Sequence, residues 1–227
     1  ISYINKKNYH LSSKIEQSIF ETNSFLIKNQ PTLIEYSAFY GSIQIFRYLF
    51  NNEIELTPSL WIYAIHGNCP DIIHFLEDNN VIPKDESFEE CLFESIKCHH
   101  NEIMNYLLDL HFSEKTNEIS IVSRIIKYYN FPAFPKNLDN IEILYYLCKY
   151  NHISLVDLIL QSYKININEI INDKQRNIAD TLLNISIEKG NVEIVRILLK
   201  YPEINVNCVT TQTIYRRSII EKKVIKS

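Results

Sequence analysis

The hydrophobic residues of this chain recur in one nine-residue pattern. Its fourth, fifth, seventh and eighth positions are apolar and its sixth is polar, which is the stripe of an α-helix that is buried along one side. Five copies of the pattern occur, at residues 42–50, 69–77, 100–108, 152–160 and 191–199. We therefore expect five helices, each of them the second helix of a repeated unit.

A second shared element precedes each of these helices. A leucine followed at helical spacing by small residues, as in Leu33 with Ser37 and Ala38, predicts a short first helix that packs closely against its neighbours. The two helices of each unit are joined through one residue, mostly Gly or Asn, which suits a left-handed helix cap. These joining residues are Gly41, Asn68, His99, Asn151 and Gly190. The predicted unit is a helix, a tight turn and a second helix.

The predicted units are unevenly spaced along the chain. Residues 117–129 have a helical pattern, but the following segment, Phe131–Pro135, contains prolines, which disfavour helix. We interpret residues 110–143 as a degenerate repeat that has lost its second helix.

The last unit resembles an ankyrin repeat, whose unit is about 33 residues long. Residues 181–199, followed by residues 203–207, are similar to a nearly complete unit that runs into its β-turn, and residues 164–168 repeat that turn. The resemblance covers residues 31–209, although the Thr-Pro and His of the family's opening motif are mostly absent. More narrowly, the Asn- and Ile-rich sequence is similar to divergent ankyrin families of parasitic protists. The resemblance implies an all-α, ankyrin-type helix-turn-helix repeat solenoid with irregular repeat lengths.

Two segments flank the predicted array. Ser13 and Glu16 fit a capping box, so we expect a helix over residues 13–28 with Ile15, Ile19 and Phe20 facing inward. This helix would make residues 1–30 an N-terminal cap of the stack. Residues 210–227 carry five Lys or Arg residues against one acidic residue. They form either a basic C-terminal tail or the start of a truncated next repeat.

Composition narrows the range of functions. The chain has 227 residues, of which 46% are hydrophobic, and a formal net charge of −4, which does not provide the positive field of a nucleic-acid-binding domain. Its three glycines are too few for phosphate-binding loops. Its five cysteines lack Cys-x-x-Cys spacing, and no apolar run is long enough for a membrane span. We expect a monomeric cytoplasmic protein that binds neither nucleic acid nor membranes.

One cluster of residues has side chains that suit a metal. Cys91, Cys98, His99 and His100 combine thiols with imidazoles, which are ligands of zinc. In the repeat register, however, the last three straddle a helix-helix turn and Cys91 begins the preceding helix, so we do not expect the four side chains to converge. The arrangement of Ser, Cys and His residues does not match a hydrolase. We therefore expect no catalytic residue, no bound metal and no cofactor.

The resemblance to ankyrin repeats implies a surface for protein partners, formed by the β-turn tips and the exposed ends of the first helices. Carried over position by position, the candidate contact residues are Phe39, Tyr40, His66, Lys97, Lys149, Tyr150, Glu188 and Lys189. They predict a groove with an aromatic end at Phe39 and Tyr40 and a basic middle at Lys97 and Lys149, which would attract an acidic partner. In an alternative interpretation, Phe39 and Tyr40 pack on the N-terminal cap.

These observations lead to one principal hypothesis about function and two alternatives. The principal hypothesis is a non-catalytic module for protein–protein interaction. In the first alternative, the repeats are the targeting arm of a larger signalling or ubiquitin-ligase adaptor protein. In the second, the chain binds a metal or a small molecule through the region from Cys91 to His100. Trp61 and Tyr63 are predicted to belong to the core.

Overall fold

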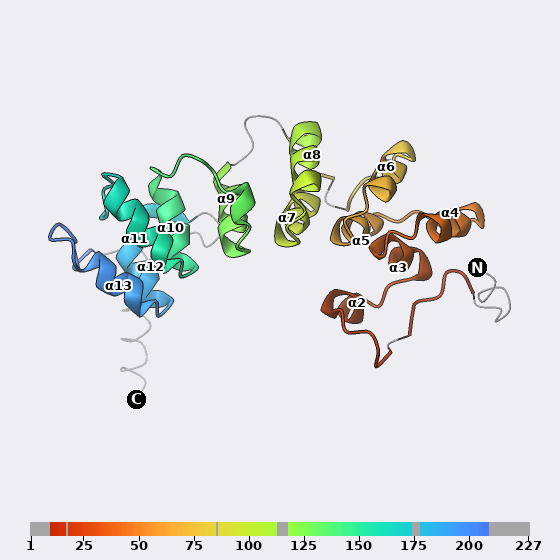
Figure 1. Cartoon of the computed structure of the whole chain (residues 1–227), viewed down its shortest axis with the longest axis horizontal. Coiled ribbons are helices and arrows are strands. Elements are labelled where there is room, and N and C mark those ends of the chain that lie inside the picture. The colour runs from red at the N-terminus through yellow and green to blue at the C-terminus, as the bar shows by residue number, and fades with distance from the viewer. Residues whose placement is uncertain (1–9, 17, 85, 113–117, 174–177, 209–227) are drawn as a thin grey trace, which may run out of the picture. The chain divides into compact units, whose positions relative to one another are not determined.

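A computed structural model of the chain describes residues 10–16, 18–84, 86–112, 118–173 and 178–208. These residues form twelve α-helices, one 3-10 helix and one two-stranded sheet (Figure 1). The predicted all-α architecture of repeated helix pairs is therefore confirmed. Contacts divide the chain into a first unit, Ile1–Thr116, and a second unit, Asn117–Ser227.

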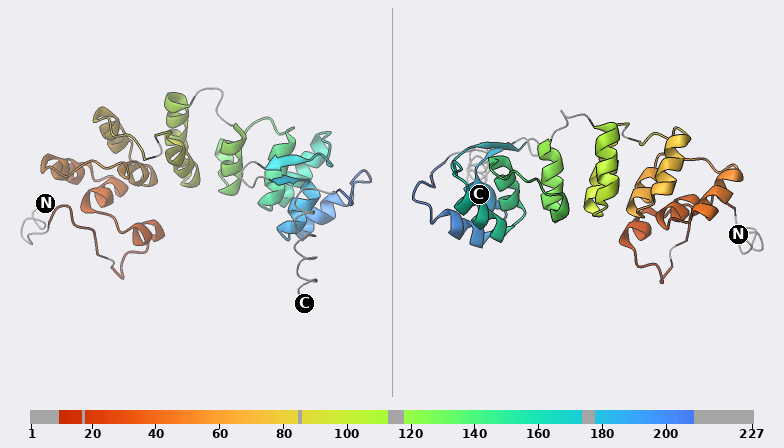
Figure 2. Two further views of the ribbon diagram at one scale, coloured as in Figure 1. Left: turned by 180° about the vertical axis from the view of Figure 1, so that it is seen from behind. Right: turned by 45° about the horizontal axis from the view of Figure 1, so that its top comes forward.

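Three helix pairs make up most of the first unit. The first helices of these pairs are α3 (Leu33–Phe39), α5 (Leu60–His66) and α7 (Glu89–Lys97). The second helices are α4 (Ile43–Asn51), α6 (Pro70–Asp78) and α8 (Asn101–His111). The first helices pack side by side, and each second helix packs on the first helix of its own pair (Figures 1 and 2). A shorter helix, α2 (Ser24–Asn29), precedes α3.

Two complete helix pairs lie in the second unit. They are α10 (Ile141–Lys149) with α11 (Ile153–Ser162), and α12 (Leu182–Glu188) with α13 (Val192–Leu198). Between the pairs, β1 (Ile171–Asp173) and β2 (Ile178–Asp180) form an antiparallel hairpin in which Ile171 lies opposite Asp180. This hairpin is not predicted from the sequence, because strands of three residues are too short to show an alternating pattern.

The second unit begins with a helix that is not followed by a second α-helix. α9 (Glu118–Lys127) leads into the 3-10 helix η1 (Phe131–Ala133), and Pro132 lies within η1. The first turn of a helix tolerates proline. Farther along, proline has no N–H to donate to the preceding turn, so the helix is interrupted. The arrangement is the one expected for a repeat that has lost its second helix.

The predicted left-handed turns between paired helices are confirmed. The φ angles at the five joining residues are 60° at Gly41, 54° at Asn68, 62° at His99, 63° at Asn151 and 71° at Gly190. In every case the next residue donates its backbone N–H to a carbonyl five residues earlier, at 2.9–3.0 Å. The turn after α9 has the same form, with φ of 59° at Tyr129 and a bond from the Asn130 N–H to the Ile125 carbonyl.

Small side chains allow the first helices to approach one another. Ala38 and Ala64 have no exposed surface, and Ser37, Ser95 and Ser186 are buried. The buried serine hydroxyls donate to carbonyls of their own helices, for example from Ser37 Oγ to the Ile34 oxygen at 2.7 Å. Because these hydroxyls are satisfied locally, they can be buried between helices without loss of a hydrogen bond.

Side chains at the start of the second helices link neighbouring repeats. His100 Nε2 lies 3.2 Å from the His66 carbonyl oxygen, and His152 Nε2 lies 2.9 Å from that of Ile126. Asn191 Nδ2 donates to the Cys148 carbonyl at 2.6 Å in the corresponding place. A carbonyl oxygen only accepts, so each imidazole carries its proton on Nε2. These bonds fix the register of one repeat on the next.

The two turn segments that resemble each other are also connected. Asn168 Nδ2 donates to the Glu203 carbonyl and Asn168 Oδ1 accepts from the Asn205 N–H, both at 2.7 Å. Residues 164–168 and 203–207 therefore occupy adjacent, equivalent positions, as their similar sequences predict.

The predicted helix over residues 13–28 is wrong in its extent. Lys14 forms a β-bridge with Thr32, and the Ile15 N–H donates to the Pro31 carbonyl, so this part of the chain is extended. The helix begins only at Ser24, where the Asn23 side chain accepts from the N–H groups of the first turn. Ile15 is half-buried, but Ile19 and Phe20 are 91% and 86% exposed and do not face inward. The predicted tail at 210–227 lies outside the described residues.

Candidate functional site

The candidate contact residues of the first unit lie at the C-terminal ends of adjacent first helices. Phe39 ends α3, His66 ends α5 and Lys97 ends α7. Their rings and charges are close: the Phe39 and Tyr40 ring centroids are 5.1 Å apart, and those of Phe39 and His66 are 5.3 Å apart. This row of residues is what the repeat register predicts for helices that pack side by side.

Part of this row is covered by α2. The Phe25 ring lies 4.1 Å from the His66 ring and 6.0 Å from the Phe39 ring, with which it stacks. Tyr40 is 52% exposed, and its hydroxyl lies 3.5 Å from a Glu21 carboxylate oxygen. Phe39 thus contacts the N-terminal segment, as the alternative interpretation expects, whereas much of Tyr40 faces solvent.

A charged group continues the row beyond His66. His66 Nε2 lies 3.2 Å from Glu94 Oε1, and Lys97 Nζ lies 2.8 Å from the same oxygen. Burial lowers the pKa of His66 below its ordinary value, although the Glu94 carboxylate acts in the opposite direction. The lowered pKa favours the neutral imidazole at neutral pH.

The four candidate residues of the second unit also lie where adjacent first helices end. Lys149 ends α10 and its ammonium lies 5.8 Å from the centroid of the Tyr150 ring. Glu188 ends α12 and pairs with Lys189 at 3.3 Å. α10 and α12 pack against each other, so both pairs belong to one face of this unit.

A groove in the first unit was missed by the sequence analysis. It has a volume of about 460 Å³ and is bordered by α2, by the first helices and by the loops between repeats. Its lining includes Phe25, Glu35, Ser59, Tyr63, Lys84 and Glu90. Ser59 Oγ donates to Glu35 Oε1 at 2.6 Å and so links the first repeat to the second. The sequence offers no signal for this groove, because it depends on where α2 lies.

The structure does not bring together the four residues whose side chains suit zinc, namely Cys91, Cys98, His99 and His100. The Cys91 thiol is buried near the start of α7, whereas His99 is exposed in the turn after α7. Cys98 instead joins two residues from outside the cluster: the ligand atoms of His66, Glu94 and Cys98 all lie within 4.8 Å of one another. The convergence of His66 with Cys98 follows from the stacking of α5 on α7.

Residues 110–210 match the family model of ankyrin repeats, in three copies. The match supports ankyrin repeats in this part of the chain. It includes α9 to α13, and the pairs of the first unit have the same helix-turn-helix form. No curated protein matches the chain.

Ankyrin repeats generally mediate protein–protein interaction, and the family is typically non-catalytic. A protein partner is therefore indicated. In the described part of the chain, no helix has the length and apolar character needed to cross a membrane.

An apolar hollow lies beside η1 in the second unit. The hollow measures about 480 Å³ and is lined by η1 and the start of α11, including Tyr129, Phe131, Phe134, His152 and Ile153. Tyr129 and Phe131 are both exposed. The sequence analysis did not single out these residues, although the loss of the second helix is the signal that could have found them.

The buried imidazole of His152 predicts a pH-dependent stability of the second unit. Burial lowers the pKa of His152. As the pH falls below the ordinary imidazole pKa of about 6.5, the unfolded chain binds a proton that the folded chain does not, so folding stability decreases. His152→Asn keeps a donor for the Ile126 carbonyl, as Asn191 shows in its own repeat, and removes the titration.

Chemical denaturation at pH about 7.5 and about 5.5 tests this expectation. The free energy of unfolding should decrease less between these pH values in His152→Asn than in the unsubstituted protein. His152→Ala should cost about 1–3 kcal/mol at the higher pH, because the buried Ile126 carbonyl loses its donor. Identical pH dependence in the Asn variant and the unsubstituted protein would show that folding does not lower the pKa of His152.

Proposed function

We propose that the chain acts as a monomeric, non-catalytic module that binds a protein partner through the ends of its first helices. The observation that carries this proposal is the row formed by Phe39, Tyr40, His66 and Lys97 on three adjacent ankyrin helices. A row of this kind offers contacts at regular intervals to an extended partner surface. Lys149, Tyr150, Glu188 and Lys189 offer a second such surface in the other unit.

Aromatic side chains lie on and beside the first of these surfaces. Tyr40 is half exposed at its edge, and the Phe25 and Tyr63 rings border the adjacent groove. Aromatic residues contribute large contact areas and are frequent among the residues that dominate binding energy. The groove lies beside Phe25, which also contacts the row, and could receive a partner side chain.

One lysine on each of the two surfaces is already paired within the chain. Lys97 contacts Glu94 and Lys189 contacts Glu188, so an acidic partner has to compete with these carboxylates. Exposed pairs of this kind contribute only about 0–1 kcal/mol. We therefore assign the lysines a role in orienting the partner and the aromatic residues the larger share of affinity.

The first alternative uses the same surface in a larger protein. The repeats would then be the targeting arm of a signalling or ubiquitin-ligase adaptor protein, and the effector would lie in another domain. In this alternative the effector domain acts on the bound partner, but the repeats bind that partner in the same way. The sequence of the entire source protein distinguishes the two.

Affinity capture with matched variants tests the proposal. One variant carries Tyr40→Ala and Lys97→Ala, and a second carries Lys149→Ala and Lys189→Ala. Phe39 is left unchanged because it packs on Phe25. Control variants carry paired changes at exposed positions of the second helices, namely Glu102→Ala with Asn105→Ala and Glu193→Ala with Arg196→Ala.

A partner bound through the first-helix ends should be captured about tenfold less by at least one of the first two variants, and equally by the controls. Circular dichroism of each variant should match that of the unsubstituted protein. Loss of a partner in the control variants alone would place binding on the second helices and contradict the proposed surface.

A further inference from the structure

We propose that His66, Glu94 and Cys98 form a zinc-binding site between the second and third ankyrin repeats of the first unit. His66 ends α5, Glu94 lies within α7 and Cys98 directly follows α7. Their ligand atoms lie within 4.8 Å of one another. The proposal goes beyond the partner surface, with which it shares His66, because it concerns the binding of a metal ion by this chain alone.

The distances in the group are close to those of a tetrahedral zinc centre. In such a centre the metal lies about 2.0–2.3 Å from nitrogen, oxygen and sulfur ligands, which places neighbouring ligand atoms about 3.3–3.7 Å apart. His66 Nε2 and Glu94 Oε1 are 3.2 Å apart, and Cys98 Sγ and Glu94 Oε1 are 3.8 Å apart. Only small side-chain rotations are needed to bring the three atoms around one ion.

The chemistry of the ligands favours zinc over magnesium or calcium. One imidazole, one thiolate and one carboxylate form a mixed set of N, S and O donors, whereas magnesium and calcium prefer oxygen alone. The Phe25 and Phe39 rings, 4.1 and 5.3 Å from the His66 ring, enclose the imidazole on one side. The His66 and Glu94 side chains keep 18% and 14% of their exposure, so an ion can reach them from solvent.

Binding requires defined proton changes. Zinc would bind Nε2 of the neutral His66 imidazole, whose proton would then lie on Nδ1. Cys98 would release its thiol proton to solvent as the zinc–sulfur bond forms, so that each bound ion liberates about one proton. Burial and Glu94 raise the pKa of the Cys98 thiol to about 12, and a cation at this point reverses that effect.

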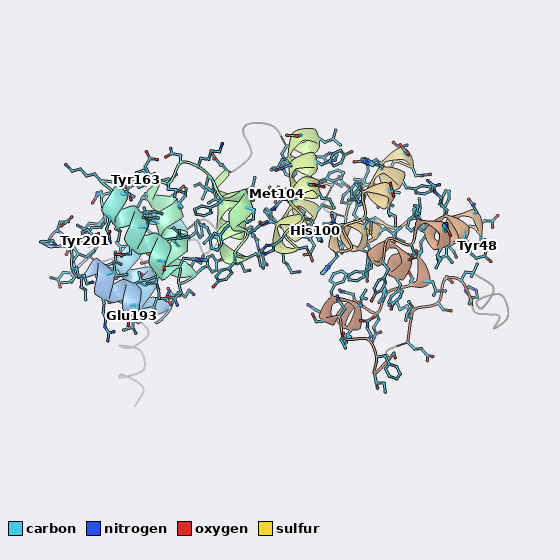
Figure 3. All side chains as sticks on the ribbon, viewed as in Figure 1. Tyr48, His100, Met104, Tyr163, Glu193 and Tyr201 are labelled. Atoms are coloured by element: carbon cyan, nitrogen blue, oxygen red, sulfur yellow. The ribbon has the colours of Figure 1, made fainter. Side chains whose placement is uncertain are left out.

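Two neighbouring cationic or titratable side chains shape the site. Lys97 Nζ contacts both Glu94 oxygens, at 2.8 and 3.0 Å, and competes with the metal for the carboxylate. His100, labelled in Figure 3 in the turn that leads into α8, bonds through Nε2 to the His66 carbonyl. Its Nε2 is therefore already engaged and is not free to act as a fourth ligand.

The test measures metal binding by the full chain after dialysis against a chelator. A calorimetric titration with zinc alone should give a stoichiometry of about one bound ion per chain. Cobalt(II) used as a probe should produce a thiolate-to-metal charge-transfer band and the intense visible bands of a tetrahedral site. Cys98→Ser should abolish the charge-transfer band. His66→Asn and Glu94→Gln should each weaken zinc binding at least about tenfold, because even residues that only position metal ligands contribute about 10–100-fold to affinity.

Matched controls separate this site from other thiols and imidazoles. His99→Asn changes the adjacent exposed histidine and keeps a residue that tolerates its φ of 62°, and Cys208→Ser removes a partly exposed thiol of the other unit. Both should bind zinc like the unsubstituted protein. Lys97→Ala removes the competing ammonium and should bind zinc more tightly.

Zinc should also raise the thermal midpoint of the unsubstituted protein but not that of Cys98→Ser. Circular dichroism without metal establishes that each variant is folded. Absence of a bound ion in the unsubstituted protein, or equal zinc affinity in Cys98→Ser, would overturn the proposal. An unchanged affinity in Lys97→Ala would contradict a site that uses the Glu94 carboxylate.

Discussion

Replacing Trp61 with alanine should lower the free energy of unfolding of the first unit by about 3–5 kcal/mol. The indole has no exposed surface, and its Nε1 donates to the Val81 carbonyl at 2.7 Å. Its ring also meets the edge of the Phe88 ring at 5.1 Å. Alanine would leave a cavity and an unpaired carbonyl between two repeats. Because the variant lacks the chain's single tryptophan, unfolding by denaturant is followed by circular dichroism.

Trp61→Phe provides the graded control. It retains most of the apolar volume but removes the donor for Val81, so it should cost about 1–3 kcal/mol, less than the alanine variant. Equal losses in the two variants would mean that the hydrogen bond, rather than the packing, accounts for the stability at this position. A loss below about 1 kcal/mol in Trp61→Ala would contradict the burial of the indole.

Replacing Gly67 with alanine should cost about 3 kcal/mol or more, at the upper end of the effects of overpacking. Its φ of −80° suits any residue, so the requirement for glycine is one of space. An added Cβ would lie 2.0 Å from the Phe39 carbonyl oxygen and 2.7 Å from the Phe39 carbonyl carbon. The first two repeats would have to move apart. Trp61 fluorescence during chemical denaturation measures the loss.

Lys189→Ala is the control at the corresponding place in the last repeat. Both residues directly precede the left-handed joining residue of their turn, but Lys189 already carries a Cβ and is exposed. Its replacement should change the free energy of unfolding by no more than about 0.5 kcal/mol. A neutral Gly67→Ala variant would mean that α3 and α5 are less closely packed than described.

The repeat architecture could be predicted because its determinants are local and recur. The spacing of apolar residues defined the second helices, and the residues at Gly41, Asn68 and Gly190 have the φ angles that their chemistry favours. Trp61 and Tyr63 are buried, as predicted. Proline in the segment after residue 130 disfavours a regular helix, and the structure forms only the 3-10 helix η1 there.

The features that were missed depend on contacts between distant segments. Ser13 and Glu16 have the residue types of a capping box, but the backbone at Lys14 pairs with Thr32 instead. The position of Phe25 against His66 determines how much of the candidate surface is exposed. Such contacts have no periodic signature, so a pattern of hydrophobic positions cannot reveal them.

The candidate site was predictable only to the level of helix register. Stacking of the first helices brings Phe39, His66 and Lys97 into one row, as expected from equivalent repeat positions. The ion pair between Glu94 and Lys97 changes the electrostatic character of that row. The sequence showed a basic position, whereas the folded chain pairs its charge with a neighbouring carboxylate.

Site-specific photo-crosslinking is the most direct test of the central claim that the ends of the first helices bind a protein partner. A photoreactive amino acid would replace Lys97 in one variant and Asn105, which is exposed on the second helix of the same repeat, in another. The account predicts that irradiation of the chain in cells of its source joins position 97, but not position 105, to a defined partner. Crosslinks from position 105 with none from position 97 would contradict it.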